Sequence, residues 1–449
     1  MDDTIAAIST ALGIGAISII RVSGKDSINI ANKIFNKDLT KAKSHTIHYG
    51  YIIDNKKIID EVLVSVMLAP KTFTTEDIVE INCHGGISTT NKILELILSN
   101  GARLAEQGEF TKRAFLNGRI DLTQAEGIMN LIESKSESSR NMSIKQLTGS
   151  VSNLISSLRK DLINIISNIE VNIDYPEYED IEVLTNDKIL PEINKIKKQL
   201  EEIIKNAQNG KLINEGINIG IIGKPNVGKS SLLNALLEEE KAIVADIEGT
   251  TRDIVEGKFI LNGIVCNIID TAGIRKTNDI VESIGVNKSL EIIDKSDLII
   301  YVLNNNEVLT EEEKELLKQI KDKNKKYIIV INKIDLANKI ELTEEYPIKI
   351  SIKENIGLED LKNRITKLFN LEEITTNDMT YLSNARSISL LKKSLRLVNE
   401  IIKNINNNSP IDIIEIDLKN VWQTLGEIIG ETYTDELIDE IFSRFCLGK

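Results

Sequence analysis

The chain has 449 residues, which is too long for one ordinary hydrophobic core, so we expect roughly three domains. Its hydrophobic content of 41% and charged content of 27% are typical of soluble globular proteins, and no apolar run reaches the roughly 18 residues of a membrane span. The formal net charge of −13 argues against binding nucleic acid through the overall field of the chain. A nucleic-acid substrate would need a local basic patch or a basic partner.

The start of the sequence, Met1-Asp2-Asp3, is acidic and lacks the basic segment that opens a secretory signal. Cys83, Cys266 and Cys446 lie far apart and match no metal-binding spacing. We therefore expect a cytoplasmic protein in a reducing compartment, with no membrane attachment.

Residues 1–118 mix short β-like runs with two helix-like stretches, which predicts an α+β domain. The β-like runs are Ala16–Val22, Val62–Leu68 and Ile78–Asn82. Glycines and the Pro70 turn separate them.

From about Asp121 onward, glycine and proline become scarce and apolar residues recur at helical spacing. The chain break at Asp174–Glu177 should end the first helix, because Pro176 lacks an N–H donor and disfavours helix in the residue before it. A second helix is expected over about 186–207, with Gly210 as its stop. The residues that share one face of the first helix are Leu154, Leu158, Leu162, Ile166 and Ile169.

Residues 215–371 alternate strand-like and helix-like segments, which predicts a mainly parallel sheet with crossover helices. Helical patterns return after about residue 375, divided by the polar segment Asn404–Pro410. Because the flanking regions are alike, we expect one helical domain into which the sheet domain is inserted. The expected strands are Ile217–Ile222, Ile264–Asp270, Leu298–Leu303, Tyr327–Ile331 and Ile348–Ser351.

Residues 223–230 fit the phosphate-binding pattern G-x-x-x-x-G-K-[ST], between a predicted strand and a predicted helix. In that context backbone N–H groups surround the phosphates, Lys229 reaches the outer phosphates and the Ser230 hydroxyl ligates Mg²⁺. The dipole of the following helix also favours the anion. The pattern therefore predicts a nucleoside triphosphate ligand.

Further motifs near the ends of predicted strands narrow this ligand to GTP. Gly249–Asp253 offers a threonine that ligates Mg²⁺ and senses the γ-phosphate, and Asp270–Gly273 offers a carboxylate and a backbone N–H. The aspartate of Asn332–Asp335 would accept two hydrogen bonds from guanine, a pair that adenine cannot supply. Ser351 ends the last strand, and its neighbourhood would close over the base.

Two positions bear on how GTP would be hydrolysed. Ile274 follows Asp-Thr-Ala-Gly where many regulatory GTPases carry glutamine, and an aliphatic side chain cannot orient the attacking water. Asn226, inside the phosphate loop, either ligates a monovalent cation that neutralises developing charge or merely stabilises the loop turn. The residues alone leave these two alternatives about even.

With these motifs in place, the sequence resembles the MnmE (TrmE) family of tRNA uridine-34 modification GTPases over nearly its full length. The resemblance rests on Gly223–Asn234, Ala242–Asp253, Asp270–Arg275, Gly108–Gly118, Asp121–Glu126 and the C-x-G-K ending Phe445–Lys449. The last three segments are far more specific than a phosphate loop, which other GTPases share.

The resemblance implies a multidomain fold of α/β plus α class. Residues 1–118 would form an α+β domain that resembles tetrahydrofolate-binding barrels and makes the contact of a homodimer. Residues 119–214 and 372–449 would form a discontinuous helical domain. Residues 215–371 would form an inserted Ras-like P-loop GTPase domain, with a parallel-rich sheet covered by helices on both faces.

The family's folate-binding positions fall on Arg21, Glu80, Arg119 and Lys449. Position 119 is often lysine in the family, so Arg119 keeps the charge and changes the donor geometry. The sequence alone favours plain strand-end surface charge for Arg21 and Glu80, and only the resemblance supports a binding role for them.

The resemblance also implies a K⁺ ion beside the phosphates, held by Asn226 and by oxygens of Ala245, Ile247 and Thr250. Position 245 is often threonine in relatives, but Ala245 still offers its backbone carbonyl. The Mg²⁺ ligands would be Ser230 and Thr251. The residues expected to contact GTP are Asn226, Val227, Gly228, Lys229, Ser230, Ser231, Ala245, Asp246, Ile247, Glu248, Gly249, Thr250, Thr251, Asp270, Thr271, Ala272, Gly273, Asn332, Lys333, Asp335 and Ser351.

Glu282 matches the family's catalytic glutamate, which positions the attacking water, although the sequence alone would favour a solvated helix charge. It joins Lys229 and Asn226 as the expected catalytic residues. Arg252 and Arg275 are rival stabilisers of the transferred charge.

Cys446 leaves two alternatives open. Its thiol is either a nucleophile toward a uridine or carrier of a one-carbon unit, or a small packed residue in a tail that contacts the folate. His84 and Cys83 make a poor catalytic dyad, because adjacent side chains of a strand point to opposite faces. We expect His84 at the entry to a turn.

The leading hypothesis is a K⁺-activated GTP hydrolase that, with the flavoprotein MnmG, adds an aminomethyl or carboxymethylaminomethyl group to C5 of wobble uridine in certain tRNAs. A 5,10-methylene- or 5-formyl-tetrahydrofolate would supply the carbon, and FAD on the partner would supply redox chemistry. GTP hydrolysis would drive G-domain dimerisation and conformational change within a heterotetramer with MnmG. The alternative is a ribosome-assembly or RNA-binding GTPase switch without modification chemistry, although such proteins commonly carry a basic module.

Overall fold

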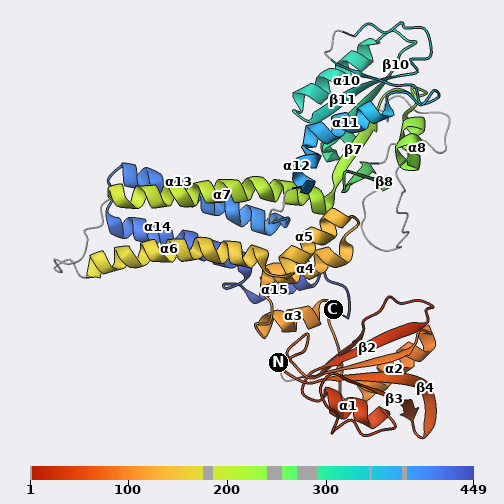
Figure 1. The fold of residues 1–449 in the computed structure, drawn as a ribbon, viewed down its shortest axis with the longest axis vertical. Coiled ribbons are helices and arrows are strands. Elements are labelled where there is room, and N and C mark those ends of the chain that lie inside the picture. The colour runs from red at the N-terminus through yellow and green to blue at the C-terminus, as the bar shows by residue number, and fades with distance from the viewer. Residues whose placement is uncertain are drawn as a thin grey trace. The chain divides into compact units, whose positions relative to one another are not determined.

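A computed structural model describes the chain over most of its length. Its residues fall into two compact units, which are described separately below (Figure 1). The first comprises Met1–Met129, Gln146–Lys197 and Leu390–Lys449, and the second comprises Asn130–Lys145 and Lys198–Ser389. Across the described residues, no helix combines the length and apolarity that crossing a membrane requires. The described residues are 3–174, 186–239, 255–269, 291–342, 346–376 and 382–448.

The first unit contains a six-stranded sheet in the order β3-β4-β5-β2-β1-β6, in which β6 runs parallel to β1 and the other described pairs are antiparallel. Side chains alternate between the faces of a strand, so Val62, Val64 and Val66 of β4 are buried and those between them are not. Helices α1 (Ser27–Ile34) and α2 (Ile87–Ser99) join these valines in one apolar cluster. The strands are β1 (Ile5–Ile8), β2 (Ile17–Ser23), β3 (Thr46–Asp54), β4 (Lys57–Met67), β5 (Ile78–His84) and β6 (Arg103–Leu104).

The α+β expectation for this region is therefore confirmed, and the three predicted strands correspond to β2, β4 and β5. The sequence patterns missed β1, β3 and β6. In β3 the outward-facing positions include Ile47, which is 67% exposed, and Tyr49, so the alternation of apolar and polar residues is obscured.

The helical part begins where glycine and proline become scarce, as predicted. On α6 the residues Leu158, Leu162, Ile166 and Ile169 are buried and Leu154 is half-buried, so the predicted face is the one that packs. Helix α6 lies against α14, although the inserted sheet domain separates the two helices in the sequence (Figure 1). The helices are α3 (Glu109–Leu116), α4 (Leu122–Glu133), α5 (Glu137–Leu147), α6 (Ser150–Asp174), α7 (Asn186–Glu215), α13 (Ala385–Asn406), α14 (Ile411–Ile429) and α15 (Asp435–Phe442).

The predicted stop at Gly210 is wrong. Helix α7 continues to Glu215 and ends before Gly216, whose φ of +82° is a left-handed conformation that suits a helix end. The last turns bury Ala207 and Ile213, and this packing outweighs the cost of about 1 kcal/mol for glycine inside a helix. Helix α6 ends at Asp174, and the rest of the predicted break lies outside the described residues.

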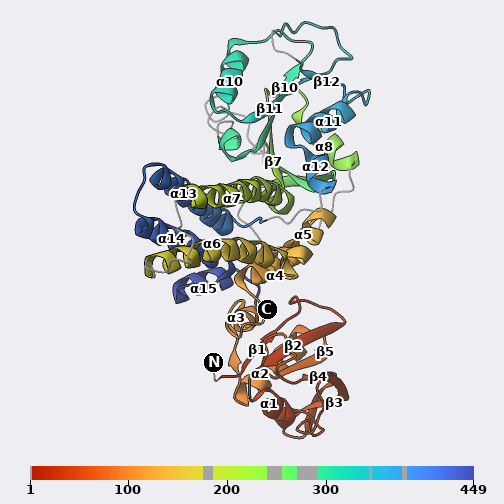
Figure 2. The same cartoon turned by 60° about the vertical axis from the view of Figure 1, so that its left-hand side comes forward.

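The second unit holds a six-stranded sheet in the order β12-β11-β10-β7-β9-β8. All described pairs are parallel except β8 with β9, which confirms the mainly parallel sheet. Figure 2 shows its strands β7, β10 and β11 together. The short strand β12 covers only the start of its predicted range, and β8 was missed. The strands are β7 (Ile217–Ile222), β8 (Val255–Leu261), β9 (Ile264–Ile269), β10 (Leu298–Asn304), β11 (Lys326–Asn332) and β12 (Ile348–Lys349).

Helices cover both faces of this sheet. Helices α8 (Lys229–Glu239) and α11 (Leu358–Phe369) pack in one apolar cluster, followed by the short α12 (Leu371–Thr376). Helix α10 (Glu311–Asp322) packs in another cluster with alternate residues of β10. Because all of β10 is buried, this strand is the centre of a doubly covered sheet, and the loops after the parallel strands gather at one edge.

Candidate functional site

The loop between β7 and α8 has a backbone suited to holding an anion. Gly223, Asn226 and Gly228 have φ values of +151°, +63° and +101°, conformations that glycine and asparagine tolerate best. A Cβ on Gly223 would lie 2.3 Å from the carbonyl oxygen of Val302. Helix α8 begins at Lys229, so the free N–H groups of its first turn adjoin the loop.

The side chain of Lys229 places a positively charged ammonium at the loop. Its ammonium donates hydrogen bonds to the carbonyl oxygens of Gly223 at 2.7 Å and Lys224 at 2.6 Å. Burial lowers the pKa of Lys229, because the charged form is poorly solvated. A phosphate would give this ammonium a charged acceptor, so the donor set fits the predicted ligand. Ser230 and Ser231 follow on α8 and are exposed.

The Asn332–Asp335 motif is joined directly to the phosphate loop. The Asn332 side-chain amide donates to the carbonyl of Val227 at 2.9 Å, and the Lys333 ammonium donates to the carbonyl of Asn226 at 2.7 Å. A Cβ on Gly228 would lie 2.2 Å from Nδ2 of Asn332, so only glycine fits there. Sequence reasoning assigned Asn332 and Lys333 to the nucleotide and missed that they fix the loop.

The side chain of Asp335 is an ionised carboxylate that can accept hydrogen bonds. The Ser351 hydroxyl donates to Oδ1 of Asp335 at 2.7 Å, and this hydrogen bond is the main reason that the pKa of Asp335 is lowered. Ser351, whose neighbourhood is expected to close over the base, is fully buried. Its position therefore adds a role that sequence reasoning missed, the orientation of the Asp335 carboxylate. A carboxylate has about four acceptor positions, so capacity for guanine remains.

Apart from Asn226, Lys229 and Ser230, the residues expected around the γ-phosphate and the cations lie outside the described residues, and so do Lys449, Arg252, Ile274 and Arg275. Within the described ranges, no group of three or more His, Cys, Asp or Glu side chains could hold a metal. The K⁺ and Mg²⁺ sites therefore stay predictions. The GTP-contact and catalytic residues concerned are Ala245, Asp246, Ile247, Glu248, Gly249, Thr250, Thr251, Asp270, Thr271, Ala272, Gly273 and Glu282.

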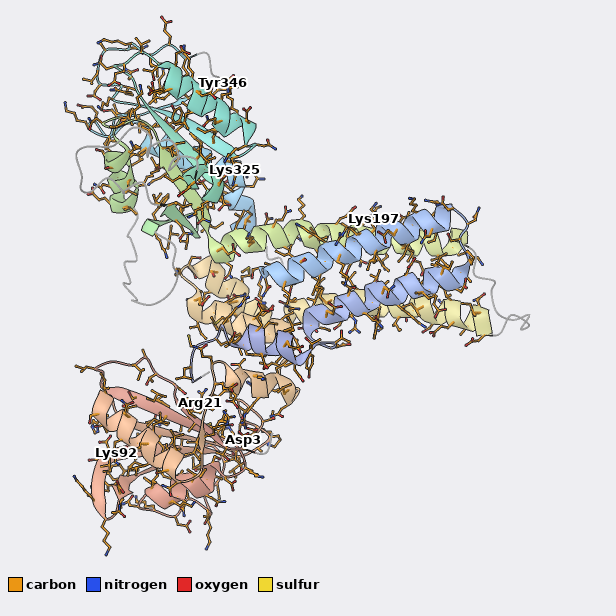
Figure 3. All side chains as sticks on the ribbon, turned by 180° about the vertical axis from the view of Figure 1, so that it is seen from behind. Asp3, Arg21, Lys92, Lys197, Lys325 and Tyr346 are labelled. Atoms are coloured by element: carbon orange, nitrogen blue, oxygen red, sulfur yellow. The ribbon has the colours of Figure 1, made fainter. Side chains whose placement is uncertain are left out.

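In the first unit, Arg21 of β2, which Figure 3 labels, lies opposite Glu80 in the register of the neighbouring strand β5. Nε of Arg21 lies 2.8 Å from Oε1 of Glu80, and the two side chains are 21% and 22% exposed. They are thus a half-buried pair in the middle of the sheet, unlike the loose strand-end charges that the sequence alone favoured.

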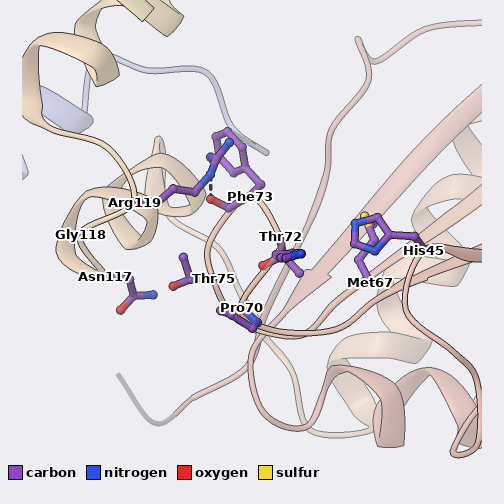
Figure 4. A pocket seen from close by; sticks show the side chains of 10 residues that line it. His45, Met67, Pro70, Thr72, Phe73, Thr75, Asn117, Gly118 and Arg119 are labelled. Carbon is purple, nitrogen blue, oxygen red and sulfur yellow. Dashed lines mark hydrogen bonds between the residues drawn. The ribbon is translucent and has the colours of Figure 1, made fainter. Parts of the chain in front are cut away.

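Phe73 brings Arg119 to the same region. The guanidinium carbons of Arg21 and Arg119 lie 5.6 Å and 4.9 Å from the centre of the Phe73 ring, within cation–π range. Nη1 of Arg119 also donates to the Phe73 carbonyl at 2.8 Å. Beside this ring lies a cavity of about 550 Å³ (Figure 4). Its lining residues are His45, Met67, Pro70, Lys71, Thr72, Phe73, Thr75, Asn117, Gly118 and Arg119.

The C-terminal tail reaches the same sheet. The Ser9 hydroxyl donates to the Gly448 carbonyl at 3.0 Å, and a Cβ on Gly448 would lie 2.3 Å from the carbonyl oxygen of Ile8. Ile8 is one residue from the position that pairs with Arg21. Cys446 is exposed, and its backbone carbonyl accepts a hydrogen bond at 3.4 Å. Gly448 therefore lies close to the strand that pairs with the Arg21 strand.

Cys83 and His84 do not form a dyad, as predicted. Cys83 is buried, and burial raises the pKa of its thiol. His84 is exposed at the end of β5, where a turn follows, and its Nδ1 lies 2.7 Å from Oδ1 of Asp60. Hydrogen bonding to Asp60 raises the pKa of His84.

Comparison with known proteins identifies the family. A family model described as the GTP-binding protein TrmE N-terminus matches residues 4–119, and the MnmE helical domain model matches residues 122–446. This chain belongs to the MnmE (TrmE) family. The tRNA modification GTPase MnmE of Bacillus cytotoxicus is 50% identical over 457 residues, covering 100% of this chain and 99% of the relative. The MnmE of Enterococcus faecalis is 51% identical over 459 residues, covering 100% and 98%.

Among solved structures, the G domain of the T. maritima FeoB iron transporter is 34% identical, covering 34% of this chain and 97% of that chain, with a TM-score of 0.26. The two family models together match the N-terminal and helical regions of this chain. The resemblance that the motifs suggested is thereby confirmed, together with the N-terminal, helical and GTPase parts of the fold.

Proposed function

We propose that this chain hydrolyses GTP and acts in the modification of tRNA. The observation that carries the GTP part is the joined arrangement of the phosphate loop and the Asn332–Asp335 motif, with Ser351 bonded to Asp335. Family membership supports the tRNA part, since relatives about 50% identical over the full chain are named tRNA modification GTPases.

In the proposed mechanism, Lys229 and the N–H groups at the start of α8 hold the phosphates, and Asp335 selects guanine. Ser230 and Thr251 would hold Mg²⁺, which supplies charge neutralisation on the phosphates. Asn226, Ala245, Ile247 and Thr250 would hold K⁺. Glu282 would position the attacking water, the task for which Ile274 has no suitable group. The rival charge stabilisers are Arg252 and Arg275.

The modification chemistry is proposed to follow the family. Glu80 offers a carboxylate to the amino and N–H edge of a pterin, Arg21 and Arg119 frame Phe73, and Lys449 completes the site from the tail. The carbon donor would be 5,10-methylene- or 5-formyl-tetrahydrofolate. FAD would be held by MnmG, in a heterotetramer with a homodimer of this chain in the cytoplasm, and the target would be C5 of U34.

The net charge of −13 supports this division of labour, because an acidic chain gains from a partner that holds much of the tRNA. GTP hydrolysis would drive pairing of the GTPase domains and a conformational change. A ribosome-assembly or RNA-binding switch remains the rival function, and it requires no folate and leaves wobble uridine untouched.

Deletion of the gene, followed by mass spectrometry of tRNA wobble uridines, tests the function. We expect the C5 modification to disappear in the deletion strain, to return with the wild-type gene and to stay absent with Lys229→Ala. A deletion strain that keeps its modified wobble uridines would favour the rival switch.

A further inference from the structure

The cavity beside Phe73 has a chemistry that is unusual for so acidic a chain. The whole sequence carries 68 acidic residues against 55 lysines and arginines, yet the cavity lining includes no acid. Lys71, Arg119 and His45 contribute its charged or chargeable groups. Lys71 and His45 are exposed, so they stand where solvent reaches the cavity. The lining therefore favours an anion.

The acids that follow Lys71 most closely in the sequence, Glu76 and Asp77, have other partners. Glu76 accepts a hydrogen bond from the Ser23 hydroxyl at 2.7 Å and pairs with Arg113 at 3.1 Å. Asp77 accepts one from the backbone N–H of Ala69 at 2.8 Å. Among the described residues, neither Lys71 nor Arg119 forms an ion pair. Their charges are left for a ligand.

Hydrogen bonds hold the wall of the cavity in place without a ligand. The Asn117 amide donates to the carbonyl of Thr74 at 2.7 Å, and the Thr72 hydroxyl donates to the carbonyl of Glu76 at 2.6 Å. Together with the bond from Arg119 to the Phe73 carbonyl, these contacts hold the loop from both ends. A pre-organised wall lowers the ordering cost of binding.

We propose that this cavity binds the poly-γ-glutamate tail of a folate, an inference that rests on the proposed function. Phe73 is common to the Arg21–Glu80 pair and to the cavity, so a ring system recognised by Glu80 has its tail directed past Phe73. Arg119 would meet the first carboxylate. Figure 4 shows His45 on the side of the cavity away from Arg119, where the later carboxylates would lie.

The proposal implies that the chain prefers folates with several glutamates over the monoglutamate. Each added γ-glutamyl unit brings one more carboxylate to a cationic lining, and exposed charge pairs contribute modestly, so three units should bind about tenfold more tightly than one. Because these pairs are exposed, the advantage should shrink as salt is raised.

The test is calorimetric titration of the full-length chain with 5-formyl-tetrahydrofolate carrying one or three glutamates. We expect the triglutamate to bind about tenfold more tightly at low salt. Lys71→Gln should remove most of this advantage and leave the affinity for the monoglutamate unchanged. Lys57→Gln, which removes an exposed lysine of the same domain outside the cavity, should change neither affinity.

Equal affinity for the two forms in the wild-type chain would overturn the tail subsite while leaving the folate proposal standing. No binding of either form would refute both. The cationic lining could instead meet an RNA phosphate. If Lys71→Gln weakens tRNA binding while the preference for the triglutamate persists, the subsite assignment is wrong.

Discussion

Asn226 combines two properties that can be separated by mutation: its backbone conformation and its side-chain oxygen. Its φ of +63° is a left-handed conformation that asparagine and glycine adopt readily, which fits the turn-stabilising alternative. Its carbonyl also accepts the hydrogen bond from Lys333. Neither observation involves the side-chain oxygen, which is the atom proposed for K⁺. A substitution by glycine suits this backbone conformation and removes the whole side chain, including that oxygen.

For Asn226→Gly we therefore expect GTP turnover in KCl to fall by about 10²-fold, to the rate that the wild type shows in NaCl, because the charge-neutralising ion is lost. Affinity for GDP should stay within about threefold, since the loop keeps its shape. Steady-state hydrolysis in the two salts measures this. Unchanged K⁺ stimulation in Asn226→Gly would leave only the turn role.

His84 provides a titration signal in the first unit. Asp60 raises the pKa of His84, so the pair stabilises the folded chain below the unfolded histidine pKa of about 6.5. This contribution is lost as the pH rises through the higher pKa of the folded state. An NMR titration of the His84 ring should show a raised pKa, which Asp60→Asn returns toward its ordinary value. An unshifted His84 in the wild type would contradict the pair.

Elements were predictable where burial is simple. A strand such as β10, buried on both faces, reads as a continuous apolar run, and α6 shows its packed face by spacing alone. In strand β8, Gly257 and Lys258 interrupt the apolar pattern of the sequence, and β3 exposes apolar side chains. The sequence patterns therefore missed both strands. The end of α7 depended on packing around Ile213, which local rules at Gly210 do not include.

Packing between α6 and α14 depends on a buried arginine that the sequence did not single out. Arg159 is 6% exposed, its guanidinium carbon lies 3.9 Å from the centre of the Trp422 ring, and it pairs with Glu431. Gly426 makes room for it, since a Cβ there would lie 3.2 Å from Nη2. The arginine therefore combines stem packing, a cation–π contact and a charge pair.

We expect Arg159→Ala to destabilise this helical part by about 2–3 kcal/mol, because the buried stem and the cation–π contact are both lost. Trp422 is the single tryptophan of the chain, so its fluorescence during urea unfolding reports on this region. Lys160→Ala, at the exposed neighbouring position, is the control and should shift the transition little. Equal midpoints for the two variants would contradict the role of Arg159.

At the scale of the whole molecule, the sequence motifs predicted the classes of ligand, but they did not predict which distant segments contact one another. The sequence indicated that Asn332 and Asp335 belong to a guanine site, but not that Asn332 bonds the phosphate loop 105 positions earlier. Likewise, Arg21, Glu80 and Arg119 needed the resemblance. Phe73 links Arg21 with Arg119, and Arg21 pairs with Glu80, only in the folded chain. The proposed nucleotide residues fall in the second unit, and the proposed folate residues fall in the first.

The central claim is that Asp335, oriented by Ser351 and held beside the phosphate loop, selects GTP. Replacing it by asparagine keeps one acceptor for the base N1–H and puts an amide donor where the carboxylate accepted from the exocyclic amine. Xanthine carries a carbonyl at that position, so it can accept from this donor.

The direct measurement is turnover of GTP and xanthosine triphosphate by wild type and Asp335→Asn. We expect the variant to lose at least about 10²-fold in kcat/KM for GTP and to gain activity toward xanthosine triphosphate. Undiminished GTP turnover by Asp335→Asn, with no gain for xanthosine triphosphate, would contradict the assignment of this site.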